Sequence, residues 1–306
     1  MYDVIIIGAG PAGMTAGIYA ARAGHKAVII EKNPMSGGQM ATTYEVNNYP
    51  GLPGIDGADL AMKMHEHARK AGAVFAVEQV LSAELENRIK VVKTKENIYE
   101  AKAVIIAVGT AHAKLGIPGE KELTGMGVSY CATCDGAFFR NKTVAVVGGG
   151  DVAVEDAIYL SGICKKVYLI HRRDSLRAAH ALQEKLQGIE NVEIIWNTVT
   201  EKICGETCVT GVQIRNVNDN RRQELELQGV FVAIGIRPET ELFRGMVDMD
   251  ENGYIHAGEN GRTSLDCVYA VGDAREKRLR QIVTAVADGA NAVCSLGEDL
   301  KKLQMK

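Results

Sequence analysis

The sequence lacks the features that mark membrane, secreted and nucleic-acid-binding proteins. No run approaches the roughly 20 apolar residues that a bilayer-spanning helix requires. The apolar stretch over residues 4–7 is too short for a signal peptide and follows no basic leader. The 35 Lys and Arg residues against 38 Asp and Glu provide no basic excess for gathering nucleic acid. We therefore expect a cytoplasmic protein with no membrane or nucleic-acid role.

Cysteine is scarce, and its placement forms no disulfide framework. Seven cysteines, an odd number, are scattered along 306 residues, unlike the cysteines of a disulfide-stapled secreted scaffold. In a cytosolic setting most of them should be thiols, while one pair works in catalysis. With 46% hydrophobic residues, the chain is long enough for a substantial core and for two domains of ordinary size.

One cysteine pair has the spacing of a redox centre. Cys131 and Cys134 are separated by two residues and followed directly by Asp135. This spacing keeps the sulfurs in bonding range and lowers one thiol pKa, which suits a cycle between dithiol and disulfide. Two other interpretations stay open: two buried apolar thiols, or a zinc site, although zinc needs four ligands and the only other close pair is Cys204 with Cys208. We expect no metal site.

The N-terminal region has the pattern of a dinucleotide-binding unit. A strand is predicted over 4–7, a helix over 12–23 and a second strand over 26–30. Between the first strand and the helix, Gly8 makes the tight turn, Gly10 lets a pyrophosphate approach the backbone, and Gly13 lets the helix pack close to the strand. Glu31, about twenty residues beyond the glycines, ends the second strand, where it can accept hydrogen bonds from a ribose.

The same pattern occurs a second time, which predicts a second bound nucleotide. A strand over 143–147, a glycine turn from Gly148 to Gly150, a helix to about 161 and a strand over 166–170 repeat the order. His171 stands where the first copy has its acid. Three arginines follow it: Arg172, Arg173 and Arg177. Guanidinium groups bind a 2′-phosphate bidentately where a carboxylate would repel it, so the second nucleotide should be NADP. The alternative is a solvated basic turn.

Further elements surround the two copies. An amphipathic helix is predicted over 57–71, short antiparallel strands over 75–98, and an apolar strand ending in glycine over 103–109 and again over 229–235. A strand over 265–273 delivers Asp273 to the sheet edge where ligands bind, unless this carboxylate is only a cap or turn residue. A helix over 281–296 then presents its positive N-terminus, which suits a reduced flavin.

Six motifs together resemble the low-molecular-weight thioredoxin reductases of the pyridine nucleotide-disulfide oxidoreductase family, over essentially the whole chain. The motifs are GAGPAG from Gly8, GGQ from Gly37, CATCDG from Cys131, GGGDVAVEDA from Gly148, HRRDSLRA from His171 and GDAREKRLRQI from Gly272. The second glycine turn departs from the family pattern, because Asp151 stands where asparagine is usual. Met126 takes a place where some members carry an arginine near the thioredoxin-docking surface.

The resemblance implies an α/β fold of two Rossmann-like, three-layer domains, the second inserted in the first. The expected boundaries are 1–113 for the first part of an FAD-binding domain, 114–240 for an NADPH-binding domain with the redox disulfide, and 241–306 for the rest of the FAD domain. The implied activity is NADPH-dependent reduction of thioredoxin or a thioredoxin-like protein by a homodimer. Cys134 would face the flavin, Cys131 would attack the partner, and Asp135 would manage the proton.

The resemblance also implies which residues contact the cofactors. FAD would contact Gly8, Gly10, Pro11, Ala12, Glu31, Gly38, Gln39, Asn48, Gly272, Asp273, Arg280, Gln281 and Ile282. NADPH would contact Gly148, Gly150, Asp151, Val152, Glu155, His171, Arg172, Arg173 and Arg177.

Three other functions compete with this one. The first is the reductase component of a peroxiredoxin (alkyl hydroperoxide reductase) system, whose members add an N-terminal disulfide-carrying domain and prefer NADH. The second is a dithiol oxidase that passes electrons to oxygen and would not need the second nucleotide-binding copy. The third is a flavin-based redox sensor without catalysis, in which the cysteine pair reports oxidation.

Overall fold

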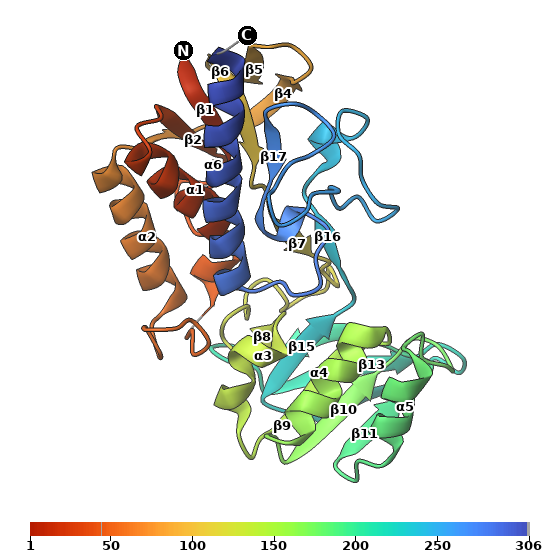
Figure 1. Ribbon diagram of the computed structural model, residues 1–306. Coiled ribbons are helices and arrows are strands. Elements are labelled where there is room, and N and C mark those ends of the chain that lie inside the picture. Colours follow the sequence, from red (N-terminus) through yellow and green to blue (C-terminus); the bar gives the residue numbers. More distant parts are fainter. Residues whose placement is uncertain (44, 305–306) are drawn as a thin grey trace. The chain divides into compact units, whose positions relative to one another are not determined.

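The computed structural model describes residues 1–43 and 45–304 (Figure 1). The chain forms two compact units. The flanking unit consists of Met1–Ala111 and Arg237–Lys306, and the inserted unit of His112–Ile236. The predicted boundaries, after residues 113 and 240, lie slightly further along the chain. Within the described residues, no helix is both long and apolar enough to cross a bilayer.

The flanking unit is built on one mixed sheet. Its strands are β1 (Tyr2–Ile7), β2 (Ala27–Glu31), β3 (Val74–Val77), β4 (Val80–Glu84), β5 (Lys90–Thr94), β6 (Ile98–Ile106) and β17 (Val268–Ala270). They run in the order β3-β2-β1-β6-β5-β4, with β17 also paired to β6. The pairs from β3 to β6 and the β6–β17 pair are parallel, whereas β4, β5 and β6 pair antiparallel. β3 therefore differs from the antiparallel arrangement predicted for this region.

Three long helices cover one face of this sheet. They are α1 (Pro11–Arg22), α2 (Gly57–Ala71) and α6 (Ile282–Gln304), which lie side by side in Figure 1. Short 3₁₀ turns occur at η1 (Gly38–Thr42), η3 (Glu241–Phe243) and η4 (Gly272–Ala274). Successive side chains of β1 point to opposite faces, so Val4 and Ile6 pack in the helix-side core, whereas Ile5 and Ile7 pack in the core on the other face. Both faces of the parallel strands are thus buried.

The inserted unit has three layers. Its parallel sheet has the order β11-β10-β9-β15-β8, and a second, antiparallel sheet has the order β12-β13-β14. The parallel strands are β8 (Val128–Ser129), β9 (Thr143–Gly148), β10 (Lys166–Ile170), β11 (Val192–Ile195) and β15 (Gly229–Ala233). The antiparallel strands are β12 (Thr198–Cys204), β13 (Gly211–Asn216) and β14 (Arg222–Glu226). The helical elements are α3 (Ala132–Asp135), η2 (Gly136–Phe139), α4 (Asp151–Ser161) and α5 (His180–Gln187).

The core of the inserted unit separates these layers. Val144 and Val146 of β9 pack with α4 on one face, whereas Ala145 and Val147 pack toward the three-stranded sheet on the other. A parallel sheet covered on both faces gives the α/β architecture that the sequence predicts.

Two segments connect the units. They are β7 (Thr110–His112) and β16 (Ile236–Pro238), which pair with each other.

Two C-terminal elements differ in length from their predictions. α6 continues to Gln304 instead of ending near 296, because Leu300 is buried and Leu303 packs on the helix-side core. The strand predicted over 265–273 is formed only at Val268–Ala270. Cys267, just before it, has a positive φ of 58°, and a 3₁₀ turn follows from Gly272.

Candidate redox centre and dinucleotide sites

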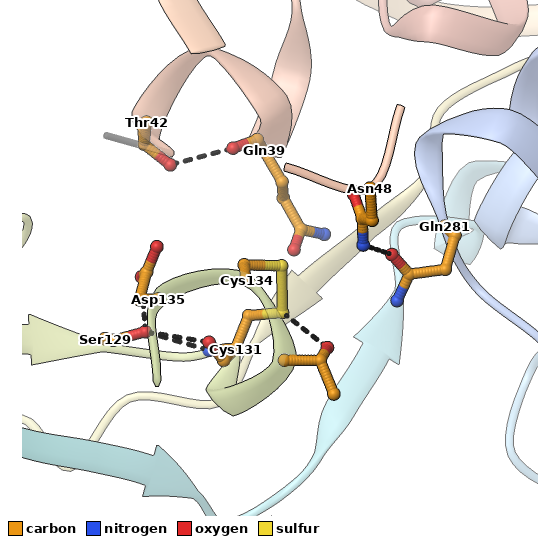
Figure 2. The surroundings of a disulfide bond; sticks show 9 residues. Gln39, Thr42, Asn48, Ser129, Cys131, Cys134, Asp135 and Gln281 are labelled. Atoms are coloured by element: carbon orange, nitrogen blue, oxygen red, sulfur yellow. Dashed lines mark hydrogen bonds between the residues drawn. A yellow bond between two sulfur atoms is a disulfide. The ribbon is translucent and has the colours of Figure 1, made fainter. Parts of the chain in front are cut away.

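The cysteine pair of the inserted unit is joined. Cys131 and Cys134 form a disulfide with their Cα atoms 5.3 Å apart (Figure 2). Cys131 occupies the N-cap of the short helix α3, and Cys134 lies within it. Both residues are partly exposed, so they are not apolar core thiols, and a sulfur engaged in a disulfide is no zinc ligand. Of the three interpretations of this pair, the structure agrees with a redox-active disulfide.

A buried carboxyl lies beside the disulfide. Asp135 Oδ2 accepts a hydrogen bond from Ser129 Oγ at 2.6 Å, and Ser129 Oγ accepts one from the Cys131 backbone N–H at 3.1 Å. Figure 2 shows this chain of contacts from the carboxyl to Cys131. Burial raises the pKa of Asp135, against the smaller opposing effect of the Ser129 hydroxyl. Its Oδ1 is buried with no hydrogen-bond partner among the described residues. A carboxyl whose pKa is raised in this way holds its proton more readily than a solvent-exposed aspartate does, and it can pass that proton to a neighbouring sulfur.

A second buried carboxylate fixes the segment on the other side of Cys131. Glu120, 3% exposed, accepts hydrogen bonds from the Leu115 N–H at 2.9 Å, the Gly116 N–H at 2.7 Å and the Tyr130 hydroxyl at 2.9 Å. The His112 ring stacks on Tyr130 with centroids 5.1 Å apart. Burial and the Glu120 contact raise the pKa of Tyr130 to about 12, so it stays a hydrogen-bond donor. The residue next to Cys131 is thereby tied to the first residues of the inserted unit.

The glycine turn of the flanking unit leaves room for a ligand at the start of α1. Gly8 has a positive φ of 107°, whereas a Cβ at Gly10 would meet nothing within 4 Å. The first turn of α1 has no side-chain cap, so its N–H groups are open to an anion. At the end of β2, Glu31 accepts a hydrogen bond from the Ala9 N–H at 2.8 Å and one from the Asn33 N–H at 2.9 Å. The turn and the predicted ribose-binding acid are therefore in direct contact.

Two buried polar atoms near η4 have no partner among the described residues. They are Asp273 Oδ1 and Arg280 Nε. The Arg280 guanidinium carbon lies 4.1 Å from the centre of the Tyr254 ring. Burial raises the pKa of Asp273, while the charges of Lys277 and Arg280 oppose this effect. Unpaired buried polar atoms are rare and indicate a bound polar group, so these residues fit a cofactor with hydroxyl and phosphate groups.

An ion cluster on α6 holds the same turn. Asp288 accepts hydrogen bonds from the Gly272 N–H at 3.0 Å, from Arg275 Nη2 at 2.7 Å and from Lys277 Nζ at 2.8 Å. The Asp288 and Lys277 side chains are each 6% exposed. Burial alone would raise the pKa of Asp288, but the contacts with Arg275 and Lys277 outweigh it and hold the pKa below its usual value. The cluster fixes the backbone directly before Asp273.

The other residues implied for FAD lie on the same unit. Gln39 Nε2 donates to Thr110 Oγ1 at 2.8 Å, and Asn48 Nδ2 donates to Gln281 Oε1 at 2.9 Å (Figure 2). Pro11 opens α1 and Ile282 opens α6. Ala12 is buried in the helix-side core. Gly38, which is exposed, begins η1, and a Cβ added to it would lie 3.7 Å from the Gly10 Cα.

The second glycine turn is similar in outline but uses a base in place of the acid. A Cβ at Gly150 would meet nothing within 4 Å, and α4 begins without a side-chain cap. His171 is 5% exposed; its Nδ1 lies 3.0 Å from the Gly148 carbonyl oxygen and its Nε2 lies 3.0 Å from the Ser175 carbonyl oxygen. Burial lowers the pKa of His171, against the two carbonyl contacts. The ring thus holds the turn from inside the protein.

The arginines that follow are available to a ligand. Arg172, Arg173 and Arg177 are exposed, and none forms an ion pair with a carboxylate in the part of the chain that the structure describes. The Arg177 N–H donates to the Gly149 carbonyl at 2.7 Å, which ties this loop to the glycine turn. Asp151 Oδ1 accepts a hydrogen bond from the Ala179 N–H at 2.7 Å. Val152 and Glu155 lie exposed on α4. The basic group is therefore attached to the turn and free of internal partners.

The structure groups the predicted site residues into a redox centre and a second glycine turn in the inserted unit, and a first glycine turn with η4 in the flanking unit. Ser129, Glu120 and Asp288 were not among the predicted residues. Ser129 stands two positions before Cys131, and this closeness in the sequence could have indicated a contact with the redox centre. Glu120, between Gly119 and Lys121, has the sequence context of a surface charge. No three His, Cys, Asp or Glu side chains gather as a metal site within residues 1–43 and 45–304.

Comparison with known proteins identifies the family. The model of the pyridine nucleotide-disulphide oxidoreductase family matches residues 2–289. The chain belongs to this family. Among its relatives are the thioredoxin reductase of Bacillus subtilis, 46% identical over 99% of this chain and 96% of that one, and that of Listeria monocytogenes, 46% identical over 95% of this chain and 92% of that one.

Solved structures of the family share the fold. Thioredoxin reductase from Streptococcus pyogenes is 45% identical, and the match covers 99% of each chain with a TM-score of 0.93. Lactococcus lactis thioredoxin reductase in the FR conformation is 41% identical and covers 99% of this chain and 100% of that one, but with a TM-score of 0.69. The α/β fold predicted from the sequence is confirmed.

Proposed function

We propose that this family member is an NADPH-dependent thioredoxin-disulfide reductase. The observation that carries the proposal is the partly exposed Cys131–Cys134 disulfide next to a buried carboxyl, in a chain that matches thioredoxin reductases over nearly its full length. Bound NADPH and FAD would supply the electron pair that reduces this disulfide. The partner is a thioredoxin or a thioredoxin-like protein.

The residues of this chain would carry out thiol–disulfide exchange, and a neighbouring carboxyl would donate and accept the proton that this exchange requires. Reduction of the Cys131–Cys134 disulfide takes two electrons and two protons and yields two thiols. The thiolate of Cys131, at the N-cap of α3, attacks a disulfide of the partner and forms a mixed disulfide; Cys134 then attacks Cys131 sulfur and releases the reduced partner. Asp135, whose pKa burial raises, gives its proton to the emerging sulfur and takes it back, and Ser129 orients this carboxyl.

We propose FAD for the flanking unit, on its first glycine turn and η4. The open N-terminus of α1 would receive phosphate oxygens, and Glu31 would bind ribose hydroxyls. Asp273 Oδ1 and Arg280 Nε, which lack partners within the described residues, would hydrogen-bond the cofactor. Loss of flavin from Asp273→Ala, read as the ratio of flavin to protein absorbance, tests this part independently of turnover.

We propose NADPH for the inserted unit. Arg172, Arg173 and Arg177 would bind the 2′-phosphate, supported by their exposure and their lack of carboxylate partners in the described chain. Gly148, Gly150 and the start of α4 would receive the pyrophosphate, while His171 shapes the turn from inside. One carboxylate oxygen of Asp151 is already occupied by the Ala179 N–H.

A movement of the two units completes the proposal. A cysteine that receives electrons beside a flavin cannot at the same time reach a protein partner, so we propose that the inserted unit rotates on its connections, near 112–118 and 237–241.

An anaerobic titration tests the function. Addition of NADPH to the holoenzyme should bleach the flavin absorbance, and subsequent addition of oxidised thioredoxin should restore it. A cross-linker that joins the two units should leave flavin bound but stop turnover. A colourless protein unable to take up FAD, or a flavin that NADPH does not bleach, would contradict the proposal.

The same experiment separates the rival functions. The exposed guanidiniums after His171, which form no ion pair within the described residues, favour NADPH, with its 2′-phosphate, over NADH, which speaks against the peroxiredoxin-system reductase. Reoxidation of the bleached flavin by oxygen alone, faster than by thioredoxin, would indicate a dithiol oxidase. An unbleached flavin would indicate a sensor.

We further propose a cytoplasmic homodimer. The five other cysteines are thiols, as expected in a reducing compartment. Sedimentation equilibrium of the purified holoenzyme should give twice the mass of the chain, and the mass of a single chain would contradict the dimer.

A further inference from the structure

The hairpin loop between β12 and β13 carries two thiols that the proposed function does not use. Cys204 ends β12 and is partly buried, whereas Cys208 lies in the loop and is exposed; both are free thiols. Together they line an open cavity of about 500 Å³. The rest of its lining is Lys202, Gly205, Glu206, Thr207 and Thr210. This is the second close cysteine pair of the sequence.

The loop folds back so that the Cys208 backbone lies against Gly205, the residue that follows Cys204. The Thr210 N–H donates to the Cys204 carbonyl at 2.9 Å, which closes the loop. Gly205 has a positive φ of 147°, and a Cβ there would lie 2.0 Å from the Cys208 carbonyl oxygen. The Cys208 backbone therefore rests on the residue next to Cys204. A disulfide requires Cα atoms about 4.4–6.8 Å apart, so the couple proposed below requires the exposed loop to bring the Cα atoms of Cys204 and Cys208 into this range.

Two other uses of the pair fit less well. Cys208 is exposed and does not pack in a core. A metal site needs further ligands, and within residues 1–43 and 45–304 no three His, Cys, Asp or Glu side chains gather to hold an ion. Two sulfurs without a third ligand are suited to bond with each other.

We propose that Cys204 and Cys208 form a second dithiol–disulfide couple, which a hydroperoxide oxidises. The Cys208 thiolate attacks the peroxide oxygen, the O–O bond breaks, and an alcohol leaves with the transferred proton. Cys204 sulfur then attacks the sulfenic acid of Cys208, and water leaves. In total, two thiols and one hydroperoxide yield one disulfide, one alcohol and one water. Burial raises the pKa of Cys204, which agrees with the exposed Cys208 as the sulfur that reacts first.

The hairpin is attached to the segment that leads to the redox centre. The Ile203 N–H donates to the Pro118 carbonyl at 3.0 Å, and the Val209 N–H donates to the Met126 carbonyl at 3.0 Å. These two contacts flank the cysteine loop, so a change in its shape is transmitted to 118–126, a few residues before Cys131. We expect oxidation of the couple to weaken the use of thioredoxin, a consequence that rests on the proposed function, whereas the couple itself does not.

The chemical test uses the full chain with Cys131→Ser and Cys134→Ser, which leaves five thiols. One equivalent of cumene hydroperoxide should lower the titratable thiols from five to three. Trypsin cuts after Lys202 and Arg215, so both cysteines lie on the peptide 203–215, which should become two hydrogens lighter and recover with dithiothreitol. Cys208→Ser should abolish the change, and the matched exposed-thiol control Cys294→Ser should keep it. An unchanged peptide, or one that gains oxygen atoms, would overturn the couple.

The functional test uses the holoenzyme before and after the same treatment. Oxidation should raise the KM for thioredoxin by about 2- to 30-fold, the range for coupling through packed segments, while NADPH-dependent ferricyanide reduction stays constant. Cys208→Ser should remove the effect. A lighter peptide with an unchanged KM would refute the transmission through Met126. If neither activity is present but the peptide still becomes lighter, the proposed function fails and the couple stands.

Discussion

The three unpaired arginines after β10 allow a quantitative prediction about nucleotide choice. In the double variant Arg172→Ala with Arg173→Ala, two guanidiniums that have no carboxylate partner in the described chain are lost. A charge-assisted hydrogen bond contributes about 1.5–3 kcal/mol, and the lower end applies because both side chains stand in water. Loss of one such bond per arginine then costs about 3 kcal/mol of NADPH binding, or roughly a hundredfold in Kd.

The comparison with NADH makes this prediction specific, because NADH has no 2′-phosphate. The Kd for NADH should change little. The ratio of the Kd for NADH to the Kd for NADPH, measured by anaerobic titration of the holoenzyme, should therefore fall by about two orders of magnitude. The matched control is Arg221→Ala with Arg222→Ala, which removes the same charge from an exposed hairpin of the same unit and should leave the ratio unchanged. Equal loss of NADPH and NADH binding would refute the phosphate assignment.

Three further predictions concern the redox centre and the flanking unit. Cys131→Ser should abolish thioredoxin reduction while NADPH still bleaches the flavin in a stopped-flow experiment. Burial raises the pKa of Asp135, so the folded state holds this proton more tightly than the unfolded chain does, and stability falls as the pH rises from the unfolded-state pKa to the folded-state pKa. Asp135→Asn should therefore raise the urea midpoint at pH 7 and slow thioredoxin reduction. A lower midpoint would contradict this prediction. Asp288→Ala leaves Arg275 and Lys277 buried without their anion and should cost about 3–5 kcal/mol of unfolding free energy, whereas a loss below 1 kcal/mol, about that of a surface ion pair, would count against the buried cluster.

Elements with a strong local signal were predicted from the sequence. α2 spans Gly57–Ala71 as expected, because Asp56 caps its first N–H groups and Gly72, with φ of 112°, ends it. β10 spans Lys166–Ile170 as expected, since an apolar run between turns is what a strand buried on both faces requires. The glycine turns and the cysteine spacing have the same character: their chemistry is contained in a few adjacent residues.

Features that depend on contacts between distant residues were not predictable. The last turns of α6 read as a polar helix end, yet Asp299 binds Arg262 and the Tyr269 hydroxyl, and these contacts hold the helix to Gln304. The role of Glu120 depends on Tyr130 and on two N–H groups of another loop. Such partners are brought together only by the tertiary fold, and no periodicity in the sequence indicates them.

The opposite polarity of the two strand-end residues limits how the two proposed nucleotide sites can be redesigned. Glu31 faces a backbone N–H and His171 faces a backbone C=O, so a simple swap would set an acceptor against an acceptor at 171. An engineer who wants NADH at the second site must therefore rebuild the peptide orientation of its glycine turn together with the side chain. The two turns share an outline, but the backbone group that each strand-end side chain meets differs, so the two sites cannot be exchanged one residue at a time.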